Sequence, residues 1–177
     1  MSINIFSYNF PEPVGSIGIA EKEGAICRVL FDCPESFLHT IELSRIITEG
    51  SSGLSGPVEQ LETDILNLAA SRFSEYLRGE RASFDLPLLY PGRCFTKKVY
   101  EELLKIPAGK TMSYRDVAIA CGAPKAYRAV GMINKTNPIP FFIPCHRVVG
   151  SDGKLVGYAG GLPLKQYLLD LEKKYYT

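Results

Sequence analysis

The character of the chain changes near residue 88, and this change restricts the folds that it can adopt. Residues 1–87 carry 13 acidic and 6 basic side chains, a net charge of −7, and begin with strand-like segments. Residues 88–177 carry 14 basic and 6 acidic side chains, a net charge of +8, and their apolar residues recur at helical spacing. We therefore expect an α/β domain over 1–87 followed by a mainly α domain over 88–177. The charges suit either a polyanion that binds the basic half or attraction between the two halves.

The N-terminal half is expected to form a small sheet and one helix. A turn at residues 21–24 would join the second and third strands, and the Ser/Gly-rich stretch 49–56 is expected to be a loop. Pro57 is expected to open a long helix that Gly79 ends. The predicted strands are Ile3–Tyr8, Gly15–Ala20 and Ala25–Phe31, and the predicted apolar stripe of the helix is Val58, Leu61, Ile65, Leu68, Phe73 and Leu77.

The C-terminal half contains a candidate helix-turn-helix. Ser113 is a good N-cap, and Asp116 three residues later favours a helix that runs to Cys121. A turn at 122–124 contains glycine and proline, and a second helix is predicted over 125–134. Basic residues surround this helix pair, which favours binding to a polyanion. Two further helices are predicted, over Phe95–Ile106 and from Pro163 to Tyr175.

Composition excludes several classes of protein. No apolar run approaches the roughly 18 residues of a membrane helix, and the N-terminus lacks a secretory pattern, so a cytoplasmic protein is expected. Five cysteines is an odd number, which argues against a disulfide framework and for a free thiol. Cys27, Cys33 and His39 match no short zinc spacing, so buried bystander cysteines are favoured over a metal site or a Cys27–Cys33 disulfide.

Cys145 is the candidate nucleophile, because His146 follows it directly and Pro144 precedes it at the end of the apolar segment 139–143. A histidine can draw the proton from a thiol, and the thiolate is the reactive form. Neighbouring residues of an extended strand point to opposite sides, so either the backbone turns here or a water molecule relays the proton. The alternatives are a core cysteine at the end of a strand and a Cys-His protease that uses the distant His39.

Three segments carry a resemblance to a known family: Asn137-Pro138, Ile143–Gly150 and Gly157–Gly161. They resemble the O6-alkylguanine-DNA alkyltransferase family, also called methylated-DNA–protein-cysteine methyltransferases, and the match covers nearly all of residues 93–177. The N-terminal half resembles the family's α/β domain only loosely. The resemblance implies a ribonuclease-H-like scaffold domain followed by a winged-helix-like domain that binds DNA and accepts the alkyl group.

The reaction that the resemblance implies is a single-turnover DNA repair. The protein would bind duplex DNA as a monomer, flip out an O6-alkylguanine and move the alkyl group onto Cys145, without a cofactor or a metal. In the family's pattern His146 activates Cys145 through water, and Glu172 orients His146. Tyr114 would donate a proton to the guanine, and Asn137 would tie the DNA-binding helices to the active-site turn. Activity toward O4-alkylthymine and the tolerated alkyl size stay open.

The resemblance also assigns a DNA interface and a pocket. Arg128 would fill the gap that the flipped base leaves, while small side chains would let the second helix enter the minor groove. The other DNA-binding positions are Tyr114, Arg115, Lys125, Ala126 and Ala129, and the pocket positions are Val148, Tyr158, Ala159, Gly160 and Lys165. Tyr127 departs from the family, in which many relatives have a small residue there, and it would either stack near the backbone or point into the core. Ala159 departs as well, because some relatives have serine there.

Two non-catalytic proteins remain as alternatives: a lesion-binding protein and a helix-turn-helix regulator. Relatives in the family that bind lesions without repairing them have tryptophan at the acceptor position. This chain contains no tryptophan and keeps Cys145, which favours catalysis. A regulator would leave the Cys-His pair unexplained. The expected location is the cytoplasm, or the nucleus in a eukaryote.

Overall fold

A computed structural model describes residues 2–33, 56–90 and 92–176. Two compact units divide the chain, Met1–Pro91 and Gly92–Thr177. The first unit extends beyond the expected boundary at residue 87 because Ile26 holds the segment that follows. The Ile26 amide donates to the Pro87 carbonyl at 2.9 Å, and the Leu89 amide donates to the Ile26 carbonyl at 2.8 Å.

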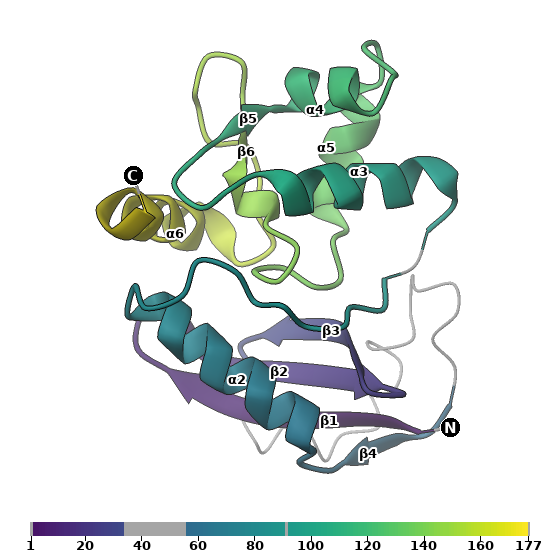
Figure 1. Ribbon diagram of the computed structural model, residues 1–177, viewed down its shortest axis with the longest axis vertical. Helices are drawn as coiled ribbons and strands as arrows, with labels where there is room; N and C mark the ends of the chain where they lie inside the picture. The colour runs from purple at the N-terminus through teal and green to yellow at the C-terminus, as the bar shows by residue number, and fades with distance from the viewer. Residues whose placement is uncertain (1, 34–55, 91, 177) are drawn as a thin grey trace. The chain divides into compact units, whose positions relative to one another are not determined.

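A four-stranded sheet of order β3-β2-β1-β4 forms the first unit (Figure 1). The antiparallel strands β1 (Ile3–Phe10), β2 (Gly15–Lys22) and β3 (Ala25–Phe31) are consecutive in the chain, whereas β4 (Val58–Gln60) lies parallel to β1. The predicted turn between β2 and β3 is confirmed. Glu23 and Gly24 have φ angles of 55° and 77°, as a two-residue hairpin turn requires.

The helix of the first unit begins later than predicted. Helix α2 is Asp64–Leu77, and the residues that follow Pro57 form β4 instead of a first helical turn. The Ile3 amide donates to the Pro57 carbonyl at 2.8 Å, which aligns this segment along the edge of β1. An open sheet edge offers hydrogen bonds that a short helical segment after a proline cannot match, and the segment therefore joins the sheet.

The buried face of α2 also differs from the predicted stripe. It consists of Leu66, Ala69, Ala70, Phe73 and Tyr76. Of the predicted stripe, Leu61 is 50% exposed and Leu68 is 42% exposed. The sheet selects the face that is covered, since the Phe73 ring lies edge-on to Phe10 of β1 with ring centroids 4.9 Å apart. Helical periodicity alone could not choose between two overlapping apolar stripes.

Four helices and two short strands form the second unit (Figure 1). The helices are α3 (Cys94–Lys105), α4 (Tyr114–Ala120), α5 (Tyr127–Lys135) and α6 (Gly161–Tyr176), and the parallel strands are β5 (Met112–Ser113) and β6 (Val148–Val149). All four predicted helices are present, with small shifts at their ends. Helices α3, α4 and α5 pack on one another around the buried Leu103, Val117 and Val130.

Local signals define the turn between α4 and α5. The Asp116 amide donates to the Ser113 hydroxyl and the Ser113 amide donates to the Asp116 carboxylate, both at 3.1 Å, so the two residues form a capping box. Gly122 ends α4 with a φ of 75°, and its amide donates to the Ile119 carbonyl at 2.9 Å. The predicted start of the first helix and the predicted turn are both confirmed.

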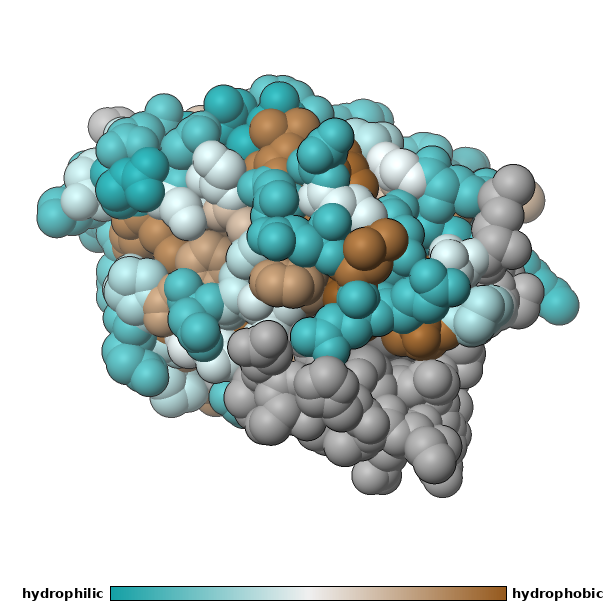
Figure 2. Space-filling view, turned by 90° about the horizontal axis from the view of Figure 1, so that it is seen from below, coloured by the Kyte–Doolittle hydropathy of each residue, from teal (hydrophilic) through white to brown (hydrophobic). Residues whose placement is uncertain are grey.

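The face drawn in Figure 2 is mixed in polarity, with hydrophobic residues scattered among hydrophilic ones. Single exposed apolar side chains are common on folded proteins and need no partner to explain them. No helix within the described ranges is long and apolar enough to cross a membrane.

Candidate active site

The Cys145 segment is a compact turn, and the expected apolar strand before it is not formed. The Ile143 amide donates to the Ile139 carbonyl at 2.9 Å, and Phe141 has a φ of 71°, so this stretch folds back on itself. The three prolines of residues 138–144 supply no N–H for a strand ladder. Cys145–Arg147 then form one turn of 3-10 helix. The backbone therefore turns at the cysteine, which was one of the two alternatives.

Asn137 closes this turn. Its Nδ2 donates to the Ile143 carbonyl at 2.9 Å, and its Oδ1 accepts from the Ile139 amide at 3.1 Å. The residue lies shortly after the end of α5 and is buried. Its side chain thus joins the end of α5 to the segment that leads into Cys145.

The Cys145 thiol is held in its protonated form. The residue is 4% exposed, and burial raises the pKa of the thiol to about 11, although a hydrogen bond from Asn137 and the charge of Lys165 act in the opposite direction. A thiol with this pKa carries its proton at neutral pH. Since only the thiolate is a strong nucleophile, the site needs a base.

His146 and Glu172 form a buried pair that could provide this base. The His146 Nε2 lies 2.8 Å from the Glu172 Oε1, and the two side chains are 1% and 0% exposed. Arg147 binds the same carboxylate through Nε at 3.0 Å and Nη2 at 2.8 Å, and its Nη1 donates to the Ile106 carbonyl at 2.6 Å. The Gly109 amide donates to the Glu172 Oε2 at 3.0 Å. The carboxylate is thus surrounded by donors.

The hydrogen-bond pattern fixes the charge state and the tautomer of the pair. Burial would raise the pKa of Glu172, but the hydrogen bonds and charges of His146 and Arg147 outweigh it and lower this pKa to about 2. Burial lowers the pKa of His146 despite the bond to Glu172. A neutral ring that donates from Nε2 to the carboxylate leaves its lone pair on Nδ1. This Nδ1 is buried and has no hydrogen-bond partner among the described residues, so it is the acceptor available to a thiol proton.

Lys165 of α6 connects the active-site turn to the loop before α6. Its Nζ donates to the Val148 carbonyl at 2.6 Å and to the Val156 carbonyl at 3.2 Å, and the residue is fully buried. Burial lowers the pKa of Lys165, and the nearby Cys145 acts against this shift. The amine therefore links the active-site turn to this loop through its two hydrogen bonds.

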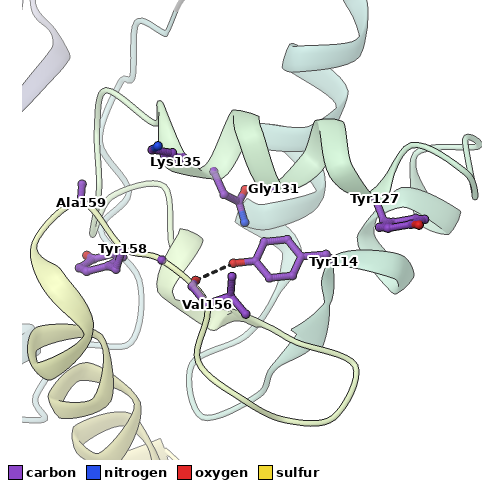
Figure 3. Close-up of a pocket in the computed structure, with 9 residues that line it drawn as sticks. Tyr114, Tyr127, Gly131, Lys135, Val156, Tyr158 and Ala159 are labelled. Atoms are coloured by element: carbon purple, nitrogen blue, oxygen red, sulfur yellow. Dashed lines mark hydrogen bonds between the residues drawn. The ribbon is translucent and has the colours of Figure 1, made fainter.

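Tyr114 lines a cavity of about 570 Å³. Its hydroxyl donates to the Val156 carbonyl at 2.9 Å across the cavity (Figure 3). Burial and the nearby Cys145 both raise the pKa of Tyr114, so its proton is retained. The complete lining is Tyr114, Tyr127, Gly131, Asn134, Lys135, Val156, Gly157, Tyr158 and Ala159.

Only part of the predicted pocket lines this cavity. Tyr158 and Ala159 do, whereas Val148, Gly160 and Lys165 are not among the lining residues. Val148 is fully buried and contributes its carbonyl to Lys165 instead. Lys165 in turn reaches the cavity wall through its hydrogen bond to the Val156 carbonyl.

The predicted DNA-binding positions lie on or beside α4 and α5 and face solvent. Arg115, Lys125, Arg128 and Ala129 are exposed, and Ala126 is half-buried. The Arg128 guanidinium lies 5.8 Å from the centre of the Tyr127 ring. Tyr127 is 44% exposed and lines the cavity, so it does not point into the core.

Sequence reasoning assigned no role to Arg147 or Asn134, which the structure places at the site. Arg147 is adjacent to the predicted pair, but its contact with a carboxylate 25 residues away is a tertiary feature. Asn134 shares one face of α5 with Tyr127 and Gly131. Gly131 follows Tyr127 by four residues and Asn134 follows it by seven, which are helical spacings. That spacing could have identified Asn134 as a pocket residue.

The described residues contain no group of three or more His, Cys, Asp or Glu side chains that could hold a metal ion. Cys27 and Cys33 are buried free thiols. The loop predicted at 49–56, apart from Gly56, and the third residue of the candidate metal site, His39, lie outside the described residues.

Comparison with known proteins gives one consistent family. Residues 94–174 match the family model described as 6-O-methylguanine DNA methyltransferase, DNA binding domain. The constitutive methylated-DNA–protein-cysteine methyltransferase of Bacillus subtilis is 41% identical over 162 residues, which cover 91% of each chain. The corresponding Methanosarcina barkeri protein is 45% identical over 126 residues, which cover 71% of this chain and 80% of that protein.

Solved structures agree over almost the whole chain. A crystal structure of the Mycobacterium tuberculosis O6-methylguanine methyltransferase aligns with a TM-score of 0.78 and 32% identity, covering 99% of this chain and 95% of that chain. The structure of Mycobacterium tuberculosis OGT in complex with DNA aligns with a TM-score of 0.75 and 31% identity, covering 99% and 94%. Both neighbours span the N-terminal sheet as well as the C-terminal helical unit. The chain belongs to the methylated-DNA–protein-cysteine methyltransferase family.

Proposed function

We propose that this protein repairs alkylated DNA by direct reversal: it transfers the alkyl group of an O6-alkylguanine in duplex DNA to the Sγ of its own Cys145. One observation carries the proposal. A buried cysteine is followed by a histidine whose Nε2 is 2.8 Å from an ionised glutamate and whose other ring nitrogen is free to accept a proton. The thioether product is stable, so each molecule reacts once.

Activation of the thiol begins with proton transfer to His146. The Nδ1 of the ring takes the proton of Cys145 through a bridging water, and Glu172 stabilises the imidazolium that forms. Arg147 keeps the carboxylate ionised, because its guanidinium is always charged and donates its own hydrogen bonds to Glu172, separate from that of His146. The buried site then holds a poorly solvated thiolate, which is a reactive nucleophile.

Alkyl transfer follows as a displacement at the alkyl carbon. A bond forms between Sγ of Cys145 and this carbon while the bond from the carbon to O6 breaks, and the electron pair moves into the guanine ring. Tyr114 donates a proton to the base, and the proton that left Cys145 returns to Tyr114, so protons balance. In the free protein the Tyr114 hydroxyl is bonded to Val156, and it must turn toward the base when the pocket fills.

DNA binding uses α4 and α5 as a helix-turn-helix of winged-helix type. Arg128 fills the gap of the flipped base, and the exposed Arg115 and Lys125 contact phosphates on the minor-groove side. The N-terminal domain, residues 1–87 of the expected division, is a ribonuclease-H-like scaffold. The protein acts as a cytoplasmic monomer in this proposal.

Intact-protein mass spectrometry tests the proposal. The protein is incubated with a duplex that contains one O6-methylguanine, and we expect a mass gain of one CH2 group located on Cys145. Cys145→Ala should show no gain, while Cys94→Ala, which removes the exposed thiol of the same unit, should behave like the parent. Binding to the alkylated duplex without any mass gain would instead support the lesion-binding alternative and would refute the proposed reaction.

A further inference from the structure

Tyr127 has an aromatic side chain that the proposed mechanism does not use. The residue is 44% exposed, and it also lines the cavity of about 570 Å³. Figure 3 shows its ring at the beginning of α5, at the opposite end of the cavity from Tyr158 and Ala159. A side chain that lines a cavity and is also open to solvent lies at the mouth of that cavity.

The guanidinium of Arg128 lies over this ring, 5.8 Å from its centre. That separation is within the range of about 6 Å in which the face of an aromatic ring attracts a cation. Neighbouring residues of a helix do not face each other, so the long arginine side chain folds back to reach the ring. Among the described residues, the ring is the only partner of this guanidinium in an ion pair, a hydrogen bond or a ring contact.

The ring holds Arg128 where the proposed function needs a cation. A base that has entered the cavity leaves its gap in the duplex outside the cavity mouth. An arginine loses side-chain freedom when it enters that gap, and a contact that already limits this freedom lowers the cost. Tyr127 and Arg128 are the first two residues of α5, whose first turn carries no acidic side chain. A helix N-terminus disfavours a cation, so the ring supplies a local attraction that the helix itself does not.

We infer that Tyr127 is a positioning residue: its ring holds the Arg128 guanidinium at the mouth of the cavity and thereby speeds the repair of duplex DNA. This inference rests on the proposed function, in which Arg128 fills the gap of the flipped base. The face of the ring is the active part, because its quadrupole attracts the cation and the hydroxyl is not needed. Tyr127 should therefore matter for duplex DNA and not for a free base, which leaves no gap to fill.

Two substrates and three variants test the inference. The rate of methylation of Cys145 is measured by intact-protein mass with a duplex that contains one O6-methylguanine and with free O6-methylguanine. Tyr127→Leu removes the ring, and Tyr127→Phe keeps the ring and removes the hydroxyl. Tyr175→Leu on α6 is the matched control, because Tyr175 is also 44% exposed and the Lys174 Nζ lies 4.7 Å from the centre of its ring.

Tyr127→Leu should slow the reaction with the duplex about two- to fivefold, the factor that corresponds to one cation–π contact at an exposed site. Its rate with free O6-methylguanine should equal that of the parent. Tyr127→Phe and Tyr175→Leu should react like the parent with both substrates. In the background of Arg128→Ala, Tyr127→Leu should cause no further loss, because the ring then has no cation to hold.

Several results would overturn the inference. Duplex repair in Tyr127→Leu that is unchanged or faster would show that the ring does not help Arg128, and equal slowing with the free base would place the effect of Tyr127 in the pocket. A further loss in the Arg128→Ala background would show that the ring acts on DNA by itself, and a similar loss in Tyr127→Phe would assign the effect to the hydroxyl. The parent is measured with the duplex first: if its Cys145 is not methylated there, the proposed function itself fails, which is a separate outcome.

Discussion

Glu172→Gln should be among the most damaging single substitutions in the second unit, because it removes a charge and retains the size of the side chain. The carboxylate accepts from His146, Arg147 and Gly109 at distances of 2.8 to 3.1 Å. A glutamine can keep one oxygen among these donors. Its NH2 group must then face either the Gly109 amide or the Arg147 guanidinium, so donor meets donor inside a fully buried site.

The expected loss of stability can be worked out in two ways. The pKa of Glu172 is about 2 in the folded protein and 4.5 for an ordinary glutamate, and this difference corresponds to about 3 kcal/mol at neutral pH. Breaking a buried ion pair by removing one partner typically costs about 3–5 kcal/mol, because the other charge stays buried. The two values agree, and we expect Glu172→Gln to lower the free energy of unfolding by about 3–5 kcal/mol.

Urea unfolding at several pH values measures this loss. A group with a lowered folded pKa stabilises above its unfolded pKa and loses this contribution as pH falls toward the folded pKa. The difference between parent and variant should therefore be complete above about pH 4.5 and shrink between about 4.5 and 2. Glu101→Gln, an exposed residue of α3, should leave the midpoint unchanged. A loss below about 1 kcal/mol, or one independent of pH, would refute the ion-pair reasoning.

Two further predictions concern the reaction. Arg128→Ala should slow repair in duplex DNA by a factor of ten or more, since unstacking a base costs a few kcal/mol. It should leave transfer from free O6-methylguanine nearly unchanged, and equal slowing in the two assays would exclude a role in base flipping. The rate with the free base should stay constant from about pH 8 down to 6.5 and fall only below that, because burial holds the pKa of His146 beneath its ordinary value of 6.5 and keeps the ring neutral. If the rate is measured over a series of pH values and its decline is centred above pH 6.5, another group is the base.

Some features could be predicted from short stretches of sequence because their causes are local. The capping box of Ser113 and Asp116 satisfies backbone groups within one turn, and Gly122 ends the helix because it adopts a positive φ readily. The hairpin turn at Glu23 and Gly24 has the same origin. Interactions within three or four residues do not depend on the rest of the fold.

Other predictions failed where a segment could adopt either of two local structures. Residues 58–60 have no strong preference of their own, and the edge of β1 decided that they form a strand. The phase of α2 depended on the sheet against which Phe73 packs, so the predicted stripe with Leu61 and Leu68 was wrong. In both cases the deciding contacts come from residues that are distant in the chain.

The same distinction between local and long-range causes applies to the active site. By itself the sequence determined the chemistry: a cysteine next to a histidine after a proline, on the basic half of the chain, defines a nucleophile with a base nearby. Only the tertiary structure decided how that chemistry is controlled. It brought Glu172 of α6 to His146 and Arg147, and it buried the thiol so that its pKa is about 11. Burial and long-range hydrogen bonds set charge states, and neither can be known before the helices have packed.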